Sequence, residues 1–241
     1  MNALLDYFQG VYIINLPSRT DRKREMQAQL TKIGLSLDHP QIEFFSAIRP
    51  DEAGEFPNIG TRGCFLSHLG VLKDAQRRGL KTILILEDDL DFSPDYLERI
   101  PGVLDSLAQS GWGVFYGGHQ LFAPIDTMYN AELAIVPPGD AVQTAHFIGF
   151  QQPIITLLID YLERILSRPG GDPEGGPMHV DGAYSWFRRQ HPDVLTLLAV
   201  TELGHQRSSR TDIHELRWYD RWVGFRKLSE TARKLKHWLN K

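Results

Sequence analysis

The sequence predicts an α/β protein built on a mainly parallel sheet with helices on both faces. Two observations carry this prediction. Over the first hundred residues, short apolar, β-branched runs alternate three times with stretches of helical spacing. Polar motifs follow directly after the first and third runs, at strand ends where such sheets bind ligands. The chemistry is therefore expected just past these strands.

The first strand is expected at residues 11–16, "VYIINL", which are apolar and mostly β-branched. A helix follows over residues 17–34, where Ser18 and Asp21 have the spacing of a capping box and a glycine ends the pattern. Residues 42–48, "IEFFSAI", are expected to form the second strand.

The next helix is expected over residues 60–79, because its apolar side chains recur at helical spacing and it closes on a glycine. Residues 81–86, "KTILIL", form the third predicted strand and lead into a cluster of acids. Ser93 is the expected N-cap of a helix over residues 93–100, which Pro101 should break or kink.

The second half of the chain is less regular. The flexible loop that separates its two predicted helices is rich in Gly and Pro. Strands are expected at 113–118, 132–136, 145–150 and 194–200, helices at 153–168 and 179–190, and the loop at 169–177.

Composition is that of an ordinary soluble protein, with 42% hydrophobic and 23% charged residues. The single cysteine, Cys64, excludes an intrachain disulfide and a metal site built on thiolates, and it favours a reducing compartment. Because the start of the sequence has no signal-peptide pattern and no apolar run reaches about 18 residues, a cytoplasmic location is expected.

The charge is unevenly distributed along the chain. Residues 217–241 hold eight Lys or Arg against two acids, a net charge of +6. Because the whole chain has a net charge of −4, the other 216 residues carry −10. With tryptophans at helical spacing, this tail predicts a basic amphipathic helix that contacts the inner face of an anionic membrane. The alternative is a helix packed on its own domain, residues 1–216. The acidic body argues against nucleic acid as a partner.

Four of the five residues after Leu86 are acids: Glu87, Asp88, Asp89 and Asp91. Such a cluster repels itself unless a cation offsets it. Oxygen ligands suit magnesium or manganese, which usually take one or two carboxylates and the phosphates of a substrate. The acids therefore predict a metal-bound nucleotide diphosphate. The alternative is that they cap the following helix, the role expected of Asp91.

Basic residues surround the start of the first long helix. A helix N-terminus and arginine both favour phosphate, so Arg19, which follows the first strand closely, is a candidate phosphate ligand. Lys23 and Arg24 are expected on a solvated face.

The stretches "VYIINLPSRTDR", "GTRGCFLSHLGVLKDA" and "ILILEDDLDF", in this order and spacing, resemble glycosyltransferase family 25, the lipopolysaccharide and lipooligosaccharide galactosyltransferases with collagen galactosyltransferases as relatives. The resemblance resumes more weakly at "HVDGAYSWF" and "QRSSRTDI". It implies a GT-A-like, Rossmann-type fold with a nucleotide-sugar half (about 1–118) and an acceptor half (119–216). It also implies a divalent metal, manganese or else magnesium, a UDP-sugar donor such as UDP-galactose, a saccharide or glycolipid acceptor and inversion at the anomeric carbon.

The resemblance also assigns roles to residues. Glu87 and Asp89 match the outer acids of the family's D-x-D equivalent and are the implied metal ligands. Pro17 departs from the family pattern. The implied nucleotide-sugar ligands are Asn15, Arg19, Arg22, Ser67, His68, Glu87 and Asp88, with Gly63 in the same motif as Ser67 and His68.

A carboxylate general base is needed on the side of the sugar away from the metal. Asp181 in "MHVDGAYSWF" is the candidate, with Tyr184 and Trp186 placed to stack on a sugar; the alternative is that Asp181 is only an N-cap. Gln206, Ser209 and Asp212 are expected to close over the diphosphate unless they form an ordinary surface loop. Two other functions stay open: a metal-dependent phosphoesterase and a non-catalytic glycan-binding module.

Overall fold

The computed structural model describes residues 2–122, 124 and 126–207. The helices are α1 (Ala3–Tyr7), α2 (Thr20–Lys32), α3 (Ile59–Arg77), α4 (Tyr96–Ala108), α5 (Ile154–Leu166) and α6 (Val180–Gln190). The strands are β1 (Gly10–Asn15), β2 (Ile42–Ser46), β3 (Thr82–Glu87), β4 (Leu90–Phe92), β5 (Val114–Tyr116), β6 (Gln120–Leu121), β7 (Leu133–Ile135), β8 (Val142–Gln143), β9 (Phe147–Gln151), β10 (Thr196–Ala199) and β11 (Gly204–Gln206).

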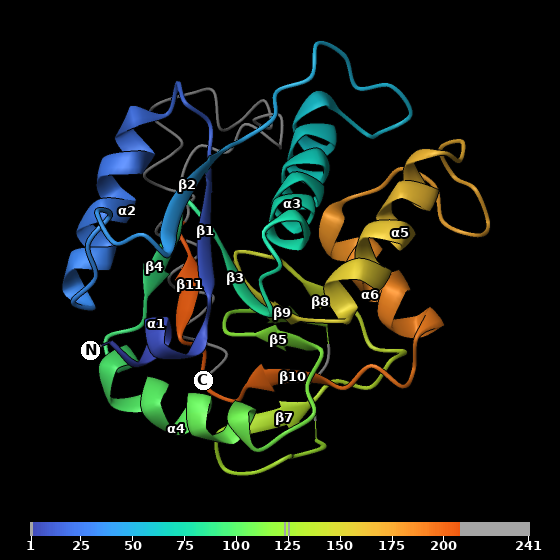
Figure 1. The fold of residues 1–241 in the computed structure, drawn as a ribbon. Coiled ribbons are helices and arrows are strands. Elements are labelled where there is room, and N and C mark those ends of the chain that lie inside the picture. Colours follow the sequence, from blue (N-terminus) through green and yellow to red (C-terminus); the bar gives the residue numbers. More distant parts are fainter. Residues whose placement is uncertain (1, 123, 125, 208–241) are drawn as a thin grey trace, which may run out of the picture. The chain divides into compact units, whose positions relative to one another are not determined.

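A seven-stranded sheet in the order β2-β1-β3-β9-β5-β10-β7 forms the centre of the described part (Figure 1). Strands β2, β1, β3, β5 and β10 share one direction, while β9 and β7 run against them. The predicted α/β fold with a mainly parallel sheet and a mixed second half is confirmed.

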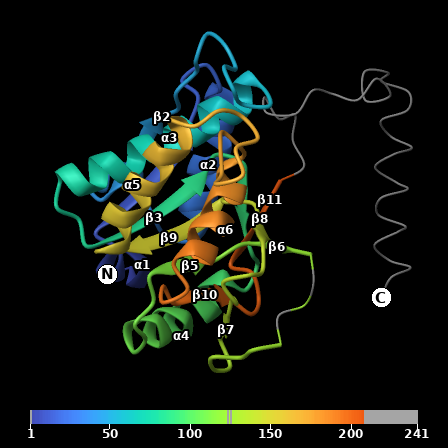
Figure 2. The ribbon, with the colours of Figure 1, turned by 90° about the vertical axis from the view of Figure 1, so that its right-hand side faces the viewer.

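Helices cover both faces of this sheet (Figure 2). Along β3, Ile83 and Ile85 point into a core with α3, α5 and α6, whereas Leu84 and Leu86 point into a second core with α1, α2 and α4. All four side chains are fully buried. This explains why the third predicted strand reads as a continuous apolar run, since both of its faces are covered.

The register of the parallel strands determines which loops meet. Ile14 of β1 lies beside Glu87 of β3, and Asn15 lies beside Ser46 of β2. Because parallel strands end at the same edge, the start of α2 and the acids after β3 come together there.

Beside this edge, β4 and β11 form a two-stranded antiparallel sheet in which Gly204 pairs with Phe92 and Gln206 with Leu90. The sequence did not predict this pairing. It brings a segment more than one hundred residues away in the chain next to the acids.

Several local predictions are wrong. Ser18 is not a helix cap, because α2 begins at Thr20 and Arg19 holds the N-cap position. Ser93 instead donates to the carbonyl of Glu202. Helix α4 starts two residues beyond the expected Pro94 and continues through Pro101 to Ala108.

The expected role of Asp91 at a helix start is also wrong. Asp91 lies in β4, and its carboxylate accepts hydrogen bonds from Gln29 at 2.6 Å and from Arg207 at 3.0 Å. A turn at Asp88 and Asp89 separates β3 from β4.

The helix ends at Gly34 and Gly79 agree with the prediction. Both glycines have positive φ, +73° and +69°, which other residues adopt at a cost. The predicted tail, residues 217–241, lies outside the described residues. Within the described part, none of the helices has the length and apolar character needed to cross a membrane.

Candidate functional site

Buried acids gather where β1 and β3 end. Asp88 and Asp89 form the turn after β3 and are only 6% and 5% exposed. Glu87, the last residue of β3, is partly exposed. Carboxylates this far from water need compensating charge or hydrogen bonds.

Asp88 has both. Its carboxylate accepts hydrogen bonds of 2.7 Å from Asn15 Nδ2 and of 2.7 Å from Arg22 Nη1. Asn15 also donates to the carbonyl of Arg19 at 3.2 Å. Burial raises the pKa of Asp88, and Arg22 and Asn15 oppose that rise. Asn15, Arg22 and Asp88, three predicted nucleotide ligands, are thus brought together, and Asp88 ties the turn before α2 to the end of β3.

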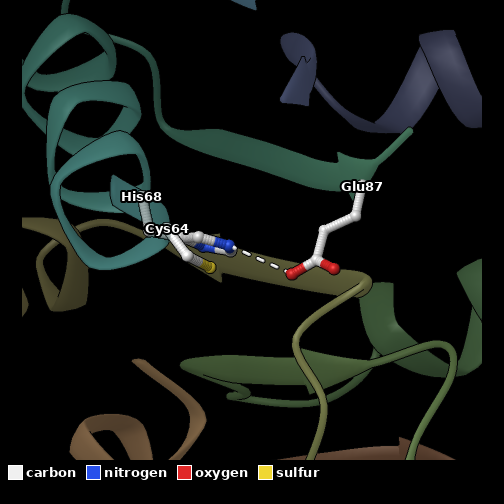
Figure 3. A group of neighbouring side chains, drawn as sticks. All are labelled: Cys64, His68 and Glu87. Carbon is white, nitrogen blue, oxygen red and sulfur yellow. Dashed lines mark ion pairs between the residues drawn. The ribbon is translucent and has the colours of Figure 1, made fainter. Parts of the chain in front are cut away.

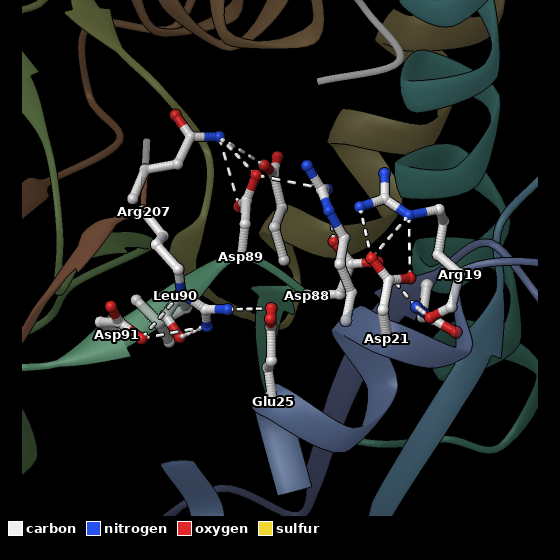
Figure 4. A network of polar contacts seen from close by, with 12 residues as sticks. Arg19, Asp21, Glu25, Asp88, Asp89, Leu90, Asp91 and Arg207 are labelled. Atoms are coloured by element: carbon white, nitrogen blue, oxygen red, sulfur yellow. Dashed lines mark hydrogen bonds and ion pairs between the residues drawn. The ribbon is translucent and has the colours of Figure 1, made fainter. Parts of the chain in front are cut away.

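Arg19 lies at the start of α2, as predicted, and forms an ion pair with Asp21, with 2.9 Å between Nη2 and Oδ2 (Figure 4). Its side chain is about one-fifth exposed. Arg22 Nη1 lies 3.4 Å from Asp89 Oδ2, so one buried guanidinium serves two acids.

Glu87 and Asp89 converge on a single point. The side-chain amide nitrogen of Gln206 lies 3.3 Å from Glu87 Oε2 and 3.4 Å from both carboxylate oxygens of Asp89. Gln206 is exposed on β11, so a ligand can displace its amide. Gln206, expected to close over a diphosphate, thus lies beside the two predicted metal ligands.

Electrostatics supports a cation at this point. Burial, and then the neighbouring charge of Glu87, raises the pKa of Asp89 to about 7. Burial also acts to raise the pKa of Glu87, but His68, His146 and Arg22 together outweigh it, so the net pKa is lowered. Two close oxygen ligands that repel each other, one of them costly to ionise, fit a hard divalent ion such as manganese or magnesium.

Arg207 fixes the strand that carries Gln206. Its Nε donates to Asp91 at 3.0 Å, its Nη1 pairs with Glu25 of α2, and its backbone N–H donates to the carbonyl of Asp89 at 2.8 Å (Figure 4). Sequence reasoning missed this residue. The only local signal was a basic residue directly after Gln206, and neither of its acidic partners is near it in the chain.

Ser67 does not face a ligand. It is fully buried, donates to the carbonyl of Gly63 at 2.6 Å and accepts from the backbone N–H of Ile48 at 2.8 Å. A Cβ at position 63 would lie 2.6 Å from the carbonyl oxygen of Ile48, so only glycine allows this approach. Ser67 was expected to contact the nucleotide-sugar, but its hydroxyl instead holds α3 against the chain that follows β2.

His68 is also fully buried, and its ring points from α3 toward Glu87 (Figure 3). Its Nδ1 is 3.0 Å from the Tyr184 hydroxyl, and its Nε2 is 3.5 Å from Glu87 Oε1. His68 therefore reaches the site through Glu87. Tyr184 is 1% exposed, so the idea that it stacks on a sugar is wrong.

Asp181 lies in the first turn of α6, and the alternative that it is the N-cap is wrong, because His179 holds that position. Its carboxylate accepts from the backbone N–H of Thr144 at 3.1 Å and from that of Gly182 at 2.7 Å. Burial, and then the charges of Glu87 and Asp181, raise the pKa of the Cys64 thiol. Trp186 is partly buried and packs beside Gly175.

Two predicted ligands, Ser209 and Asp212, lie outside the described residues. The described site is therefore built from β1, the start of α2, the end of β3 and β11, with α3 and α6 behind and beside it.

Comparison with known proteins gives a family match. Residues 8–112 match the family model described as glycosyltransferase family 25 (LPS biosynthesis protein). A glycosyltransferase 25 family member of Anopheles gambiae is 32% identical over 127 residues, which cover 46% of this chain and 22% of that protein. The human procollagen galactosyltransferase 2 is 28% identical over 205 residues, covering 77% of this chain and 31% of that protein.

A human relative named inactive glycosyltransferase 25 family member 3 is 24% identical over 135 residues, covering 48% of this chain and 23% of that protein. The chain thus spans between a fifth and a third of the length of these relatives. Among solved structures, a glycosyltransferase involved in glycosylation of the major capsid of PBCV-1 overlaps 79% of this chain and 92% of its own, with a TM-score of 0.37 and 14% identity.

Proposed function

Residues 8–112 form a glycosyltransferase family 25 region, and from this premise we propose that the chain is a metal-dependent glycosyltransferase that uses a nucleotide-sugar donor. The convergence of Glu87 and Asp89 where β1 and β3 end is the observation that carries the proposal. The names of the galactosyltransferase relatives favour galactose, delivered as UDP-galactose, as the transferred sugar. We propose a saccharide, such as a lipopolysaccharide or another surface glycan, as the acceptor.

In this proposal Glu87 and Asp89 hold the divalent ion, manganese before magnesium. When bound, the ion offsets the charge that develops on the departing diphosphate. Arg22 keeps both Asp88 and Asp89 compensated, and Gln206 supplies an exposed amide that gives way to the donor. The start of α2 offers backbone N–H groups to phosphate, with Arg19 beside them.

Asp181 is the proposed general base. A hydroxyl of the acceptor attacks the anomeric carbon and loses its proton to the Asp181 carboxylate. The bond from that carbon to the diphosphate oxygen breaks on the opposite face, and UDP leaves with the bonding electron pair. One displacement of this kind inverts the anomeric centre.

The basic segment 217–241 is proposed to hold the enzyme at the inner face of an anionic membrane, where a lipid-linked acceptor would be found. Sedimentation with vesicles that contain anionic lipid tests this. The full chain should sediment and a chain ending at residue 216 should not, and equal sedimentation of the two would contradict the role.

Thermal unfolding with UDP and Mn²⁺ tests the donor site. The combination should raise the melting temperature more than either ligand alone, because both bind the folded state. Asp89→Asn should abolish the increase. The matched control is Asp105→Asn, a change at an exposed acid of α4, which should keep it. A melting temperature indifferent to UDP with Mn²⁺ would overturn the donor site.

Release of UDP from a panel of UDP-sugars, without acceptor and then with glycan acceptors, identifies the donor. A second function is favoured by one observation, the inactive human relative. A chain that binds UDP with Mn²⁺ but releases no UDP from any donor, with or without acceptor, would be a non-catalytic binding module.

A further inference from the structure

The single thiol of the chain lies beside a histidine and a carboxylate. Cys64 and His68 are four residues apart on α3, a spacing that places both side chains on one face of the helix. Glu87 approaches them from the end of β3 (Figure 3). One potential ligand atom from each residue lies within 4.8 Å of the other two. A single cysteine excludes a site built on several thiolates but allows a mixed group of this kind.

The His68 imidazole is oriented toward the group. Its Nδ1 is held by the Tyr184 hydroxyl at 3.0 Å, while its Nε2, fully buried, has no hydrogen-bond partner among the described residues and faces Glu87 Oε1 at 3.5 Å. Metal-binding histidines commonly use the second ring nitrogen to bond an oxygen atom, which fixes the ring. The Tyr184 hydroxyl can accept from Nδ1–H and so leave the Nε2 lone pair for an ion.

The surroundings of the thiol are negative. Burial, and then the charges of Glu87, Asp181 and Asp89, raises the pKa of Cys64 well above its usual range. A cation bound between the thiol and Glu87 would offset these carboxylates.

We propose that Cys64, His68 and Glu87 form a second metal site, selective for a borderline-soft divalent ion of the zinc type. Sulfur, imidazole nitrogen and carboxylate oxygen are the ligands that zinc takes in proteins, at about 2.0–2.3 Å, whereas manganese and magnesium prefer oxygen. Zinc ligands in a tetrahedron stand roughly 3–4 Å apart, so a shift of about 1 Å or less completes the site. On binding, the Cys64 thiol releases its proton to solvent, and the fourth position is open to water.

Glu87 belongs to both metal sites. A zinc-type ion bound by Cys64 and His68 takes a ligand from the manganese site, so the two ions compete. This consequence, unlike the zinc site itself, rests on the proposed function. The competition makes zinc an inhibitor of the nucleotide-dependent activity.

Titration with Co²⁺, a spectroscopic substitute for zinc, tests the site in the full chain. Because Cys64 is the only cysteine, any thiolate-to-cobalt charge-transfer absorption must come from it. The band should appear with Co²⁺ and disappear when Zn²⁺ displaces it. Absence of the band in the folded chain would overturn the site, without need of a variant.

Calorimetric titration with Zn²⁺ then assigns the ligands. Cys64→Ser and His68→Gln should each weaken Zn²⁺ binding at least tenfold. Asp89→Asn should leave it within threefold, as should His39→Gln, a control at a partly exposed histidine between α2 and β2. A Zn²⁺ affinity that falls in Asp89→Asn but not in Cys64→Ser would also overturn the site.

The increase in melting temperature with UDP and Mn²⁺ should show the opposite pattern, lost in Asp89→Asn and kept in Cys64→Ser. The two proposals therefore fail separately. A cobalt band without an effect of UDP and Mn²⁺ supports the zinc site and overturns the donor site. The reverse result overturns the zinc site and leaves the donor site supported.

Discussion

The Tyr184 hydroxyl lies 3.0 Å from Nδ1 of His68, and this hydrogen bond joins α6 to α3 inside the core. The two rings also pack edge to face, with 5.8 Å between their centroids. Nε2 of the same imidazole faces Glu87, the proposed metal ligand. Asp181, the proposed base, lies on α6 three residues before Tyr184. The Tyr184–His68 hydrogen bond therefore connects the metal ligand to the helix that carries the base.

Tyr184→Phe should therefore affect both stability and metal binding. Removal of the hydroxyl leaves Nδ1 of a fully buried His68 without its partner, which costs about 1–3 kcal/mol of the free energy of unfolding. The freed ring also no longer orients Glu87, so the melting-temperature increase with UDP and Mn²⁺ should shrink. Urea unfolding and thermal unfolding measure the two effects.

Tyr161→Phe is the matched control. The Tyr161 hydroxyl is buried in the same core but has no hydrogen-bond partner in the part of the chain that the structure describes, so its removal should cost little. Equal losses of stability for the two variants would contradict a specific role of the Tyr184–His68 bond.

Much of the fold follows from local patterns in the sequence. Strands β1 and β3 are apolar runs bounded by polar residues, and α3 and α5 have helical spacing, so all four were predicted. The β4–β11 pair was not, because each strand has three residues and their pairing joins segments more than one hundred residues apart. No local signal encodes such a contact, yet it places Gln206 and Arg207 at the site.

Only part of the site was predicted, because local sequence patterns do not encode contacts between distant segments. The expectation that ligand-binding residues gather at strand ends placed the start of α2 near the acids after β3, and the family resemblance added Asn15 and Arg22. Sequence alone could not tell which polar side chains face a ligand and which face the protein. The Ser67 hydroxyl bonds the backbone of Gly63 and Ile48, and the Tyr184 hydroxyl bonds His68. Both sets of contacts depend on how α3 and α6 pack.

Arg22→Met should destabilise the protein by about 3–5 kcal/mol, because it leaves Asp88 and Asp89 buried without their cation. The loss should be larger at pH 8 than at pH 5, since protonation relieves the uncompensated acids. Addition of Mn²⁺ should recover part of it at pH 8. Urea unfolding at both pH values, with and without Mn²⁺, measures these effects.

Arg77→Met provides the comparison. Arg77 pairs with Asp74 at 2.5 Å, but its side chain is 74% exposed, so the loss should not exceed about 1 kcal/mol. A loss for Arg22→Met as small as that for Arg77→Met would show that Asp88 and Asp89 do not depend on the buried cation.

The raised pKa of Asp89 predicts a stability that depends on pH. The folded-state value of about 7 exceeds the unfolded value of about 3.9, so the folded protein holds this proton longer. The free energy of unfolding contributed by Asp89 is therefore greatest below about pH 4, falls as the pH rises toward about 7 and is level above that.

Asp89→Asn should remove this dependence. Relative to the unchanged protein, the variant should gain on the order of 3–4 kcal/mol between pH 4 and pH 8 in the absence of metal. The comparison of the two proteins at each pH cancels the titration of other groups. A constant difference across this range would show that the pKa of Asp89 is not raised by its surroundings.

Asp181→Asn separates catalysis from structure. Asparagine keeps an oxygen that accepts the Thr144 N–H bond, now 3.1 Å long, but it cannot take a proton from the acceptor. UDP and Mn²⁺ should still raise the melting temperature, while sugar transfer should fall about 10²–10⁴-fold. Transfer at the unchanged rate would remove Asp181 from the mechanism.

Asp181→Ala is the structural counterpart of this variant. It also removes the acceptor for Thr144, a residue held at a φ of +70° that its side chain disfavours, so the segment around β8 loses an anchor. We expect a further loss of about 1–3 kcal/mol in the free energy of unfolding relative to Asp181→Asn. If Asp181 served only to hold Thr144, the rate of sugar transfer would fall only where stability falls. Transfer would then be lost in Asp181→Ala and kept in Asp181→Asn. Loss of transfer in both variants, with destabilisation in only one, identifies the proton acceptor.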